Sequence, residues 1–155
     1  MIEPLGQQFR DAVVLLVEDN VDHAFLIRES FEDAKVRLVL HHVERGDLCM
    51  AFLRREGPYT DAPRPDLILL DLDMPRMDGY EVLKAINEDY ALRSLPVIVM
   101  TTSAEAVDVQ RMYDLRCSSY IAKPNDFERL SQVIRQMVHY WLNVVTLPAR
   151  GDSLR

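Results

Sequence analysis

The 155-residue chain has little cysteine and lacks the pattern of an N-terminal leader. Its two cysteines, Cys49 and Cys117, show no spacing typical of metal ligands. The first residues, MIEPLGQQFRDAVV, carry acidic and polar side chains where a signal peptide has a basic segment followed by an apolar one. We therefore expect a reduced, cytoplasmic protein.

Long apolar runs and an excess of positive charge are also missing. No run approaches the ~18 apolar residues that a membrane-spanning helix needs. Lys and Arg number 18 against 25 Asp and Glu, which gives a net charge of −7. Because duplex DNA and anionic membranes attract basic surfaces, we expect neither a nucleic acid nor a membrane as the main partner. The length fits one domain, and the chain has no internal repeats.

Short apolar runs alternate with segments of helical periodicity along most of the chain. The runs typical of buried strands lie at 13–17, 36–43, 67–70, 96–100 and 119–122. Apolar residues recur at helical spacing in 24–34, 48–56, 80–89 and 104–115, and a last helix runs from about Asp126 past Trp141. This alternation predicts an α/β domain with a doubly wound, five-stranded parallel sheet and helices on both faces.

Chemically active side chains follow four of the predicted strands. In chain order they are Glu18 and Asp19, Asp71 and Asp73, Thr101, and Lys123. Such sheets bind ligands beyond the carboxyl ends of their strands, so we expect these residues to form one site. Crowded carboxylates repel one another unless a cation lies among them, and oxygen ligands suit Mg²⁺. The sequence therefore predicts a magnesium site in which Asp71 attacks phosphorus.

Taken singly, several of these residues have a structural explanation. Thr101 could be a hydrogen-bonded core hydroxyl and Lys123 a solvated surface lysine. For Asp78, which precedes Gly79, we prefer a role as helix cap. Only the joint placement after successive strands favours a shared site.

Four motifs in this order resemble the receiver domain of two-component response regulators. The motifs are LLVEDN, LILLDLDMPRMDG, VIVMTTS and SYIAKP, and the likeness extends from Val13 to Trp141. The resemblance implies a flavodoxin-like fold with strand order 2-1-3-4-5. It also implies a phosphoacceptor signalling protein rather than an enzyme, with only self-catalysed phosphotransfer and slow autodephosphorylation.

Carried over by position, the resemblance assigns a metal shell around the phosphoacceptor Asp71. Asp19 would be a direct Mg²⁺ ligand, Glu18 would act largely through water, and the backbone carbonyl of Asp73 would complete the shell. Asp73 departs from the residues usual at this position, so its extra carboxylate is expected to alter metal affinity or dephosphorylation.

The resemblance also assigns the residues that hold the phosphoryl group and transmit its arrival. Thr101 and Lys123 would bind phosphoryl oxygens, and the peptide bond between Lys123 and Pro124 would be cis. Tyr120 would move between an outward and an inward position as Thr101 is drawn to the phosphate. A strand aromatic packed against the helix over 104–115 is the simpler explanation of Tyr120.

Two other functions fit parts of the pattern. Asp71 and Asp73 form a D-x-D motif after an apolar strand, as in haloacid-dehalogenase-like Mg²⁺-dependent phosphatases. That family needs an acidic pair after its lysine, whereas the pair here, Glu18 and Asp19, precedes it. A receiver-shaped interaction module without phosphorylation is the third possibility, although such a module has no need of Asp71, Thr101 and Lys123 together.

The expected organisation is a lead-in over 1–11, a receiver domain over 12–145 and a tail over 146–155, with no output domain. Loop and tail patterns are similar to those of regulators paired with bacterial phytochrome-type sensor histidine kinases, which suggests such a kinase as partner. In the last helix Leu130, Ile134, Met137, Trp141 and Val144 form one apolar stripe, and a second stripe comprises Val138, Leu142 and Val145. We expect the second stripe to mediate a homodimer through the fourth and fifth helices and the tail, unless the tail folds over its own core.

Overall fold

Five parallel strands form the centre of the computed structural model, which describes residues 11–149. They are β1 (Ala12–Val17), β2 (Leu38–Val43), β3 (Leu67–Leu70), β4 (Val97–Thr101) and β5 (Ser119–Ala122). Their order is β2-β1-β3-β4-β5, and all four neighbouring pairs are parallel. The predicted fold class and strand order are thus confirmed.

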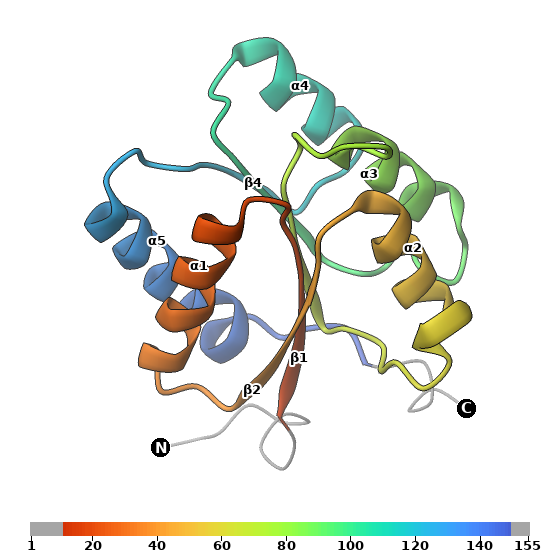
Figure 1. Ribbon diagram of the computed structural model, residues 1–155, viewed down its shortest axis with the longest axis horizontal. Coiled ribbons are helices and arrows are strands. Elements are labelled where there is room, and N and C mark those ends of the chain that lie inside the picture. The colour runs from red at the N-terminus through yellow and green to blue at the C-terminus, as the bar shows by residue number, and fades with distance from the viewer. Residues whose placement is uncertain (1–10, 150–155) are drawn as a thin grey trace.

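Helices cover both faces of the sheet (Figure 1). One face carries α1 (Val21–Asp33) and α5 (Phe127–His139), and the other carries α2 (Gly46–Arg54), α3 (Gly79–Glu88) and α4 (Ala106–Asp114). The strands are buried on both sides because each face packs its own apolar cluster. This burial explains why β1, β3 and β4 are continuous runs of apolar residues rather than alternating ones.

Two helix starts beside the sheet edge are fixed by capping side chains. Asn20 accepts a hydrogen bond from the His23 amide at 3.0 Å, and Asp78 accepts one from the Glu81 amide at 2.9 Å. The capping role preferred for Asp78 is therefore observed. The next residue, Gly79, lies so close to β3 that a Cβ atom there would come within 2.4 Å of the Asp71 carbonyl oxygen. A side chain at this position would push α3 away from the end of β3.

The end of α5 differs from the prediction. Val138 and Leu142, assigned to a free second stripe, are buried in the core, whereas Val144 is 59% exposed. Val138 lies on the core-facing side of the regular helix α5. For Leu142 and Val144 the reason is a π-helical segment, Tyr140–Val144 (η2), whose wider turn changes the face that each presents. The second stripe is therefore not available to a partner.

The chain beyond η2 returns to its own core. Leu147 is 8% exposed and belongs to the cluster beneath α1 and α5, and Val145 packs against the same cluster. The chain therefore packs on this core at least as far as Leu147. The lead-in at 1–10 and the tail at 150–155 lie outside the described residues. Between 11 and 149, no helix combines the length and apolarity needed to cross a membrane.

Candidate functional site

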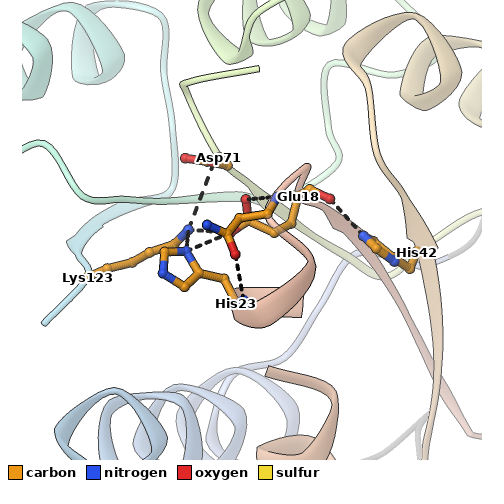
Figure 2. Close-up of polar contacts among 6 residues, drawn as sticks. Glu18, His23, His42, Asp71 and Lys123 are labelled. Atoms are coloured by element: carbon orange, nitrogen blue, oxygen red, sulfur yellow. Dashed lines mark hydrogen bonds and ion pairs between the residues drawn. The ribbon is translucent and has the colours of Figure 1, made fainter. Parts of the chain in front are cut away.

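The carboxyl ends of four strands bring the predicted site residues to one edge of the sheet. Glu18 and Asp19 follow β1, Asp71 follows β3, Thr101 ends β4 and Lys123 follows β5. Figure 2 shows Lys123 reaching between Asp71 and the side chains of Glu18 and His23. The site is built by sheet topology, since its members come from the ends of four different strands.

Three carboxylates form a cluster that could hold a metal ion. One oxygen from each of Glu18, Asp19 and Asp71 lies within 4.8 Å of the other two. Glu18 and Asp71 are buried, whereas Asp19 is exposed. Hard oxygen ligands open to water on one side match the coordination that Mg²⁺ prefers, because this ion keeps several of its own waters.

Asp71 is held in an environment that disfavours its charge. Burial, followed by a hydrogen bond and repulsion from Glu18, raises the pKa of Asp71 to about 7. Lys123 and the backbone amide of Asp73 act in the opposite direction and lower this pKa. A divalent cation at the cluster would favour the ionised form that a nucleophile requires.

Lys123 is almost fully buried at the centre of the site. Its Nζ donates to Glu18 Oε1 and to His23 Nδ1, the latter at 3.1 Å, and lies 3.9 Å from Asp71 Oδ2. The side chains of Lys123 and Glu18 are only 2% and 1% exposed. Lys123 is therefore not the solvated surface lysine that its residue type alone suggests.

His23 is a member of the site that the sequence analysis missed. It lies in the first turn of α1, where the Asn20 cap directs it back toward the strand ends. Burial and the nearby Lys123 lower the pKa of His23, which favours the neutral imidazole, the form whose Nδ1 can accept a hydrogen bond. Asn20, an N-cap residue directly after Glu18 and Asp19, was the available signal, because a helix that starts there returns its first turn to the site.

Thr101 presents an unpaired hydroxyl. The residue is fully buried, and its Oγ1 has no hydrogen-bond partner among residues 11–149. Leaving a buried hydroxyl without a partner costs about 1–3 kcal/mol. An anionic oxygen bound at Asp71 would supply an acceptor, so the expected role of Thr101 fits the structure. The alternative of a hydrogen-bonded core hydroxyl does not fit it.

Tyr120 lies apart from the carboxylates, against the loop between β4 and α4. Its hydroxyl donates to the Ser103 carbonyl at 2.8 Å, and Ser103 Oγ donates to Asp108 at 2.6 Å. Burial raises the pKa of the Tyr120 phenol. The structure shows this one position of the ring, in which Tyr120 ties β5 to the loop that begins just after Thr101.

The Lys123–Pro124 peptide bond and the side chain of Asp73 lie next to these residues. The peptide bond between Lys123 and Pro124 was expected to be cis and is not: every peptide bond of the described residues is trans. The trans form is the intrinsically favoured one, even before proline, by about 0.5–1 kcal/mol. The Asp73 side chain is exposed and is not part of the carboxylate cluster. Its backbone amide, rather than its carboxylate, contacts Asp71.

Comparison with known proteins shows the family to which this chain belongs. Residues 14–135 match the model of the response regulator receiver domain. The chain belongs to the response regulator receiver family. The matched range includes most of β1, the other four strands, and the site residues Glu18, Asp19, Asp71, Thr101 and Lys123.

Individual relatives agree with the family assignment. Response regulator Rcp1 of Synechocystis sp. is 39% identical over 137 residues, which cover 88% of this chain and 93% of the relative. A crystal structure of the phosphorylated cyanobacterial phytochrome response regulator RcpA is 40% identical, with a TM-score of 0.87 over 90% of this chain and 99% of that one. The Mn²⁺-bound form of Rcp1 is 38% identical, with a TM-score of 0.86 over 89% and 99% of the two chains.

These findings identify the protein as a receiver-domain response regulator of two-component signalling, a family whose role is generally signalling rather than catalysis. Neither the phosphatase nor the phosphorylation-independent module is favoured. The D-x-D motif of Asp71 and Asp73 is thus not a phosphatase motif here, in agreement with the position of Glu18 and Asp19 directly after β1 rather than after Lys123.

Proposed function

We propose that Asp71 accepts a phosphoryl group from the phosphohistidine of a sensor histidine kinase. The observation that carries this proposal is the placement of a buried Asp71 within a carboxylate cluster and beside the ammonium of Lys123. In the transfer, a carboxylate oxygen of Asp71 forms a bond to phosphorus while the bond from phosphorus to the donor nitrogen breaks. The imidazole nitrogen keeps the electron pair, and the product is an acyl phosphate.

Mg²⁺ is the cofactor that this donor set fits. Asp19 and Asp71 would bind it directly, Glu18 would act through water, and the backbone carbonyl of Asp73 would complete the protein ligands. The ion would neutralise charge on the transferring group. Of the three clustered carboxylates, Asp19 is the exposed one, and it would give the ion access from solvent.

Thr101 and Lys123 would bind phosphoryl oxygens, and Thr101 would change position when the phosphoryl group binds. Thr101 Oγ1 would gain its missing partner, and Lys123 Nζ would contribute a charged donor. Movement of Thr101 would pull on the loop that Tyr120 holds through Ser103. A local change in charge would thereby alter the surface formed by α4 and β5, which another protein reads.

The names of the relatives suggest the class of kinase. Rcp1 and RcpA are similar to this chain over most of its length, and RcpA is described as a phytochrome response regulator. We therefore propose a phytochrome-type sensor histidine kinase as the phosphodonor.

We also propose a cytoplasmic location. Both cysteines are free and buried, in keeping with a reduced cytoplasmic setting.

Intact mass after incubation with Mg²⁺ and acetyl phosphate tests the phosphoacceptor. The wild type should gain one phosphoryl group that hydroxylamine removes, and Asp71→Asn should gain none. Asp114→Asn, at an exposed position on α4, is the matched control and should be labelled like the wild type. Labelling that persists in Asp71→Asn, or steady hydrolysis of phosphate esters, would contradict the proposal.

We also propose a homodimer formed by α4, β5, α5 and η2. Tyr113, Tyr140 and Val144 are exposed at 49%, 54% and 59%, and a groove of about 490 Å³ opens between β5 and α5 beside Trp141. A second copy could pair these apolar surfaces, since β5 is an edge strand. Leu147 lies in the core of its own domain, so we do not assign this tail residue to the interface.

Light scattering with Tyr140→Glu and Val144→Glu tests this dimer. Both substitutions place charge on exposed positions, so the fold should tolerate them while association is lost. A chain shortened at Asn143 is a poorer test, because it also removes the core residue Leu147. A wild type that stays monomeric before and after phosphorylation would contradict the proposal.

A further inference from the structure

His23 is the side chain of the site to which none of the expected roles applies. Its Nδ1 lies 3.1 Å from Lys123 Nζ and 3.7 Å from Glu18 Oε1. His23 lies outside the carboxylate cluster that could hold a metal, and its side chain is 23% exposed. It therefore contacts the ammonium that the site uses without being a metal ligand itself.

Lys123 and His23 are brought together from distant parts of the fold. Lys123 follows β5, and His23 is on α1, one hundred residues earlier in the chain. The Asn20 cap holds the His23 backbone by its amide. The position of Nδ1 is consequently set by the start of α1, whose location the sheet fixes, and not by a mobile loop.

The effect of this contact depends on the number of N–H groups on the lysine ammonium. An ammonium has three N–H groups at tetrahedral angles. In Lys123 one donates to Glu18 Oε1 and a second to His23 Nδ1. Two acceptors from different elements stop rotation about the Cε–Nζ bond, and the third N–H is then fixed in direction. Figure 2 shows Asp71 on the side of Nζ away from His23, and Asp71 Oδ2 is 3.9 Å from Nζ.

We infer that His23 is a positioning residue for phosphoryl transfer to Asp71: by accepting a hydrogen bond from Lys123, it holds one N–H of the ammonium toward the oxygens of the incoming phosphoryl group. This inference rests on the proposed phosphoacceptor role of Asp71. A Lys123 held by Glu18 alone could rotate, and its remaining donors would meet the phosphoryl group in many orientations.

His23→Asn and His23→Leu introduce side chains of similar size that differ in their ability to accept a hydrogen bond. In His23→Asn, the side-chain carbonyl oxygen takes the place of Nδ1 and keeps an acceptor for Lys123. In His23→Leu the acceptor is lost while apolar packing is kept. A merely structural role of the imidazole predicts that both variants behave alike, whereas a positioning role predicts that only the leucine variant is impaired.

The test is the rate of acyl-phosphate formation at saturating Mg²⁺ and acetyl phosphate, followed by intact mass. Loss of orientation should slow His23→Leu about tenfold, and His23→Asn should stay within about twofold of the wild type. The Mg²⁺ concentration at half-saturation should be the same for all three proteins. His139→Leu, at an exposed position on α5, controls for the loss of a histidine elsewhere.

Each remaining result overturns the inference. Equal rates in His23→Leu and the wild type, or an equal loss in both variants at unchanged thermal stability, would overturn the positioning role alone. A wild type that gains no phosphoryl group would overturn the proposed function and this inference with it. The two failures are distinguishable because the second is seen before any His23 variant is compared.

Discussion

Lys123 and Glu18 form an ion pair that is removed from solvent, with side chains 2% and 1% exposed. Removing one member of a buried pair leaves the other as an uncompensated charge, which costs about 3–5 kcal/mol. We expect Lys123→Met to lower the free energy of unfolding by about this amount. Urea denaturation in EDTA measures it.

The double variant Glu18→Gln with Lys123→Met is the control for this pair. With both charges absent, most of the lost stability should return, although phosphorylation should not. If Lys123→Met alone were as stable as the wild type, the ammonium would not be compensating Glu18 in the folded protein.

The raised pKa of Asp71 predicts a pH-dependent gain in stability for Asp71→Asn. The unfolded carboxyl ionises near its usual value of 3.8, whereas the folded one ionises near 7. Between these values the unfolded state binds fewer protons than the folded state, so the wild type loses stability as the pH rises. Asparagine does not ionise, so the Asp71→Asn variant does not lose stability in this way. The advantage of Asp71→Asn should grow from about pH 4 to about pH 7 and then level at about 4 kcal/mol, since each pKa unit corresponds to about 1.4 kcal/mol.

Urea denaturation of both proteins at pH 4.5 and pH 8 in EDTA measures this difference. Asp114→Asn should show a constant difference from the wild type, because Asp114 is exposed. An advantage of Asp71→Asn that is the same at both pH values would mean that Asp71 is not costly to ionise.

Thr101→Val separates function from stability. The Thr101 hydroxyl is buried without a partner, so replacing it with a methyl group of similar shape should raise the free energy of unfolding by about 1 kcal/mol. The same change removes a donor to the phosphoryl group, and the phosphorylated fraction at steady state should fall. Thermal unfolding and intact mass measure the two effects. A less stable valine variant would show that the hydroxyl has a partner in solution.

Asp73→Asn tests the acid that departs from the usual receiver pattern. Its side chain is exposed, so stability should change by less than about 0.5 kcal/mol. A carboxylate near the metal should strengthen Mg²⁺ binding and repel hydroxide. The asparagine variant should therefore bind Mg²⁺ more weakly and have a shorter acyl-phosphate lifetime. Calorimetry and decay followed by mass measure both quantities, and no change in either would show that the side chain does not act on the site.

The sequence by itself determined the order of the elements and the strands that are buried. Apolar runs such as LILL at 67–70 can only be satisfied in a sheet covered on both faces, and alternation with amphipathic helices then requires parallel strands. The candidates Asp71, Thr101 and Lys123 followed from the same rule, because parallel strands end at one edge. The motifs that identified the family are local in sequence and needed no coordinates.

Only the tertiary structure decided the features that depend on contacts between distant segments. The contact of His23 with Lys123 requires α1 and the end of β5 to meet, and no periodicity encodes that distance. The π-helical turn at Tyr140–Val144 buried Leu142 and exposed Val144, since a regular helical period could not foresee a wider turn. Sequence fixes what a residue can do through its side-chain chemistry and local spacing. Packing then decides which acceptor, charge or apolar surface it meets.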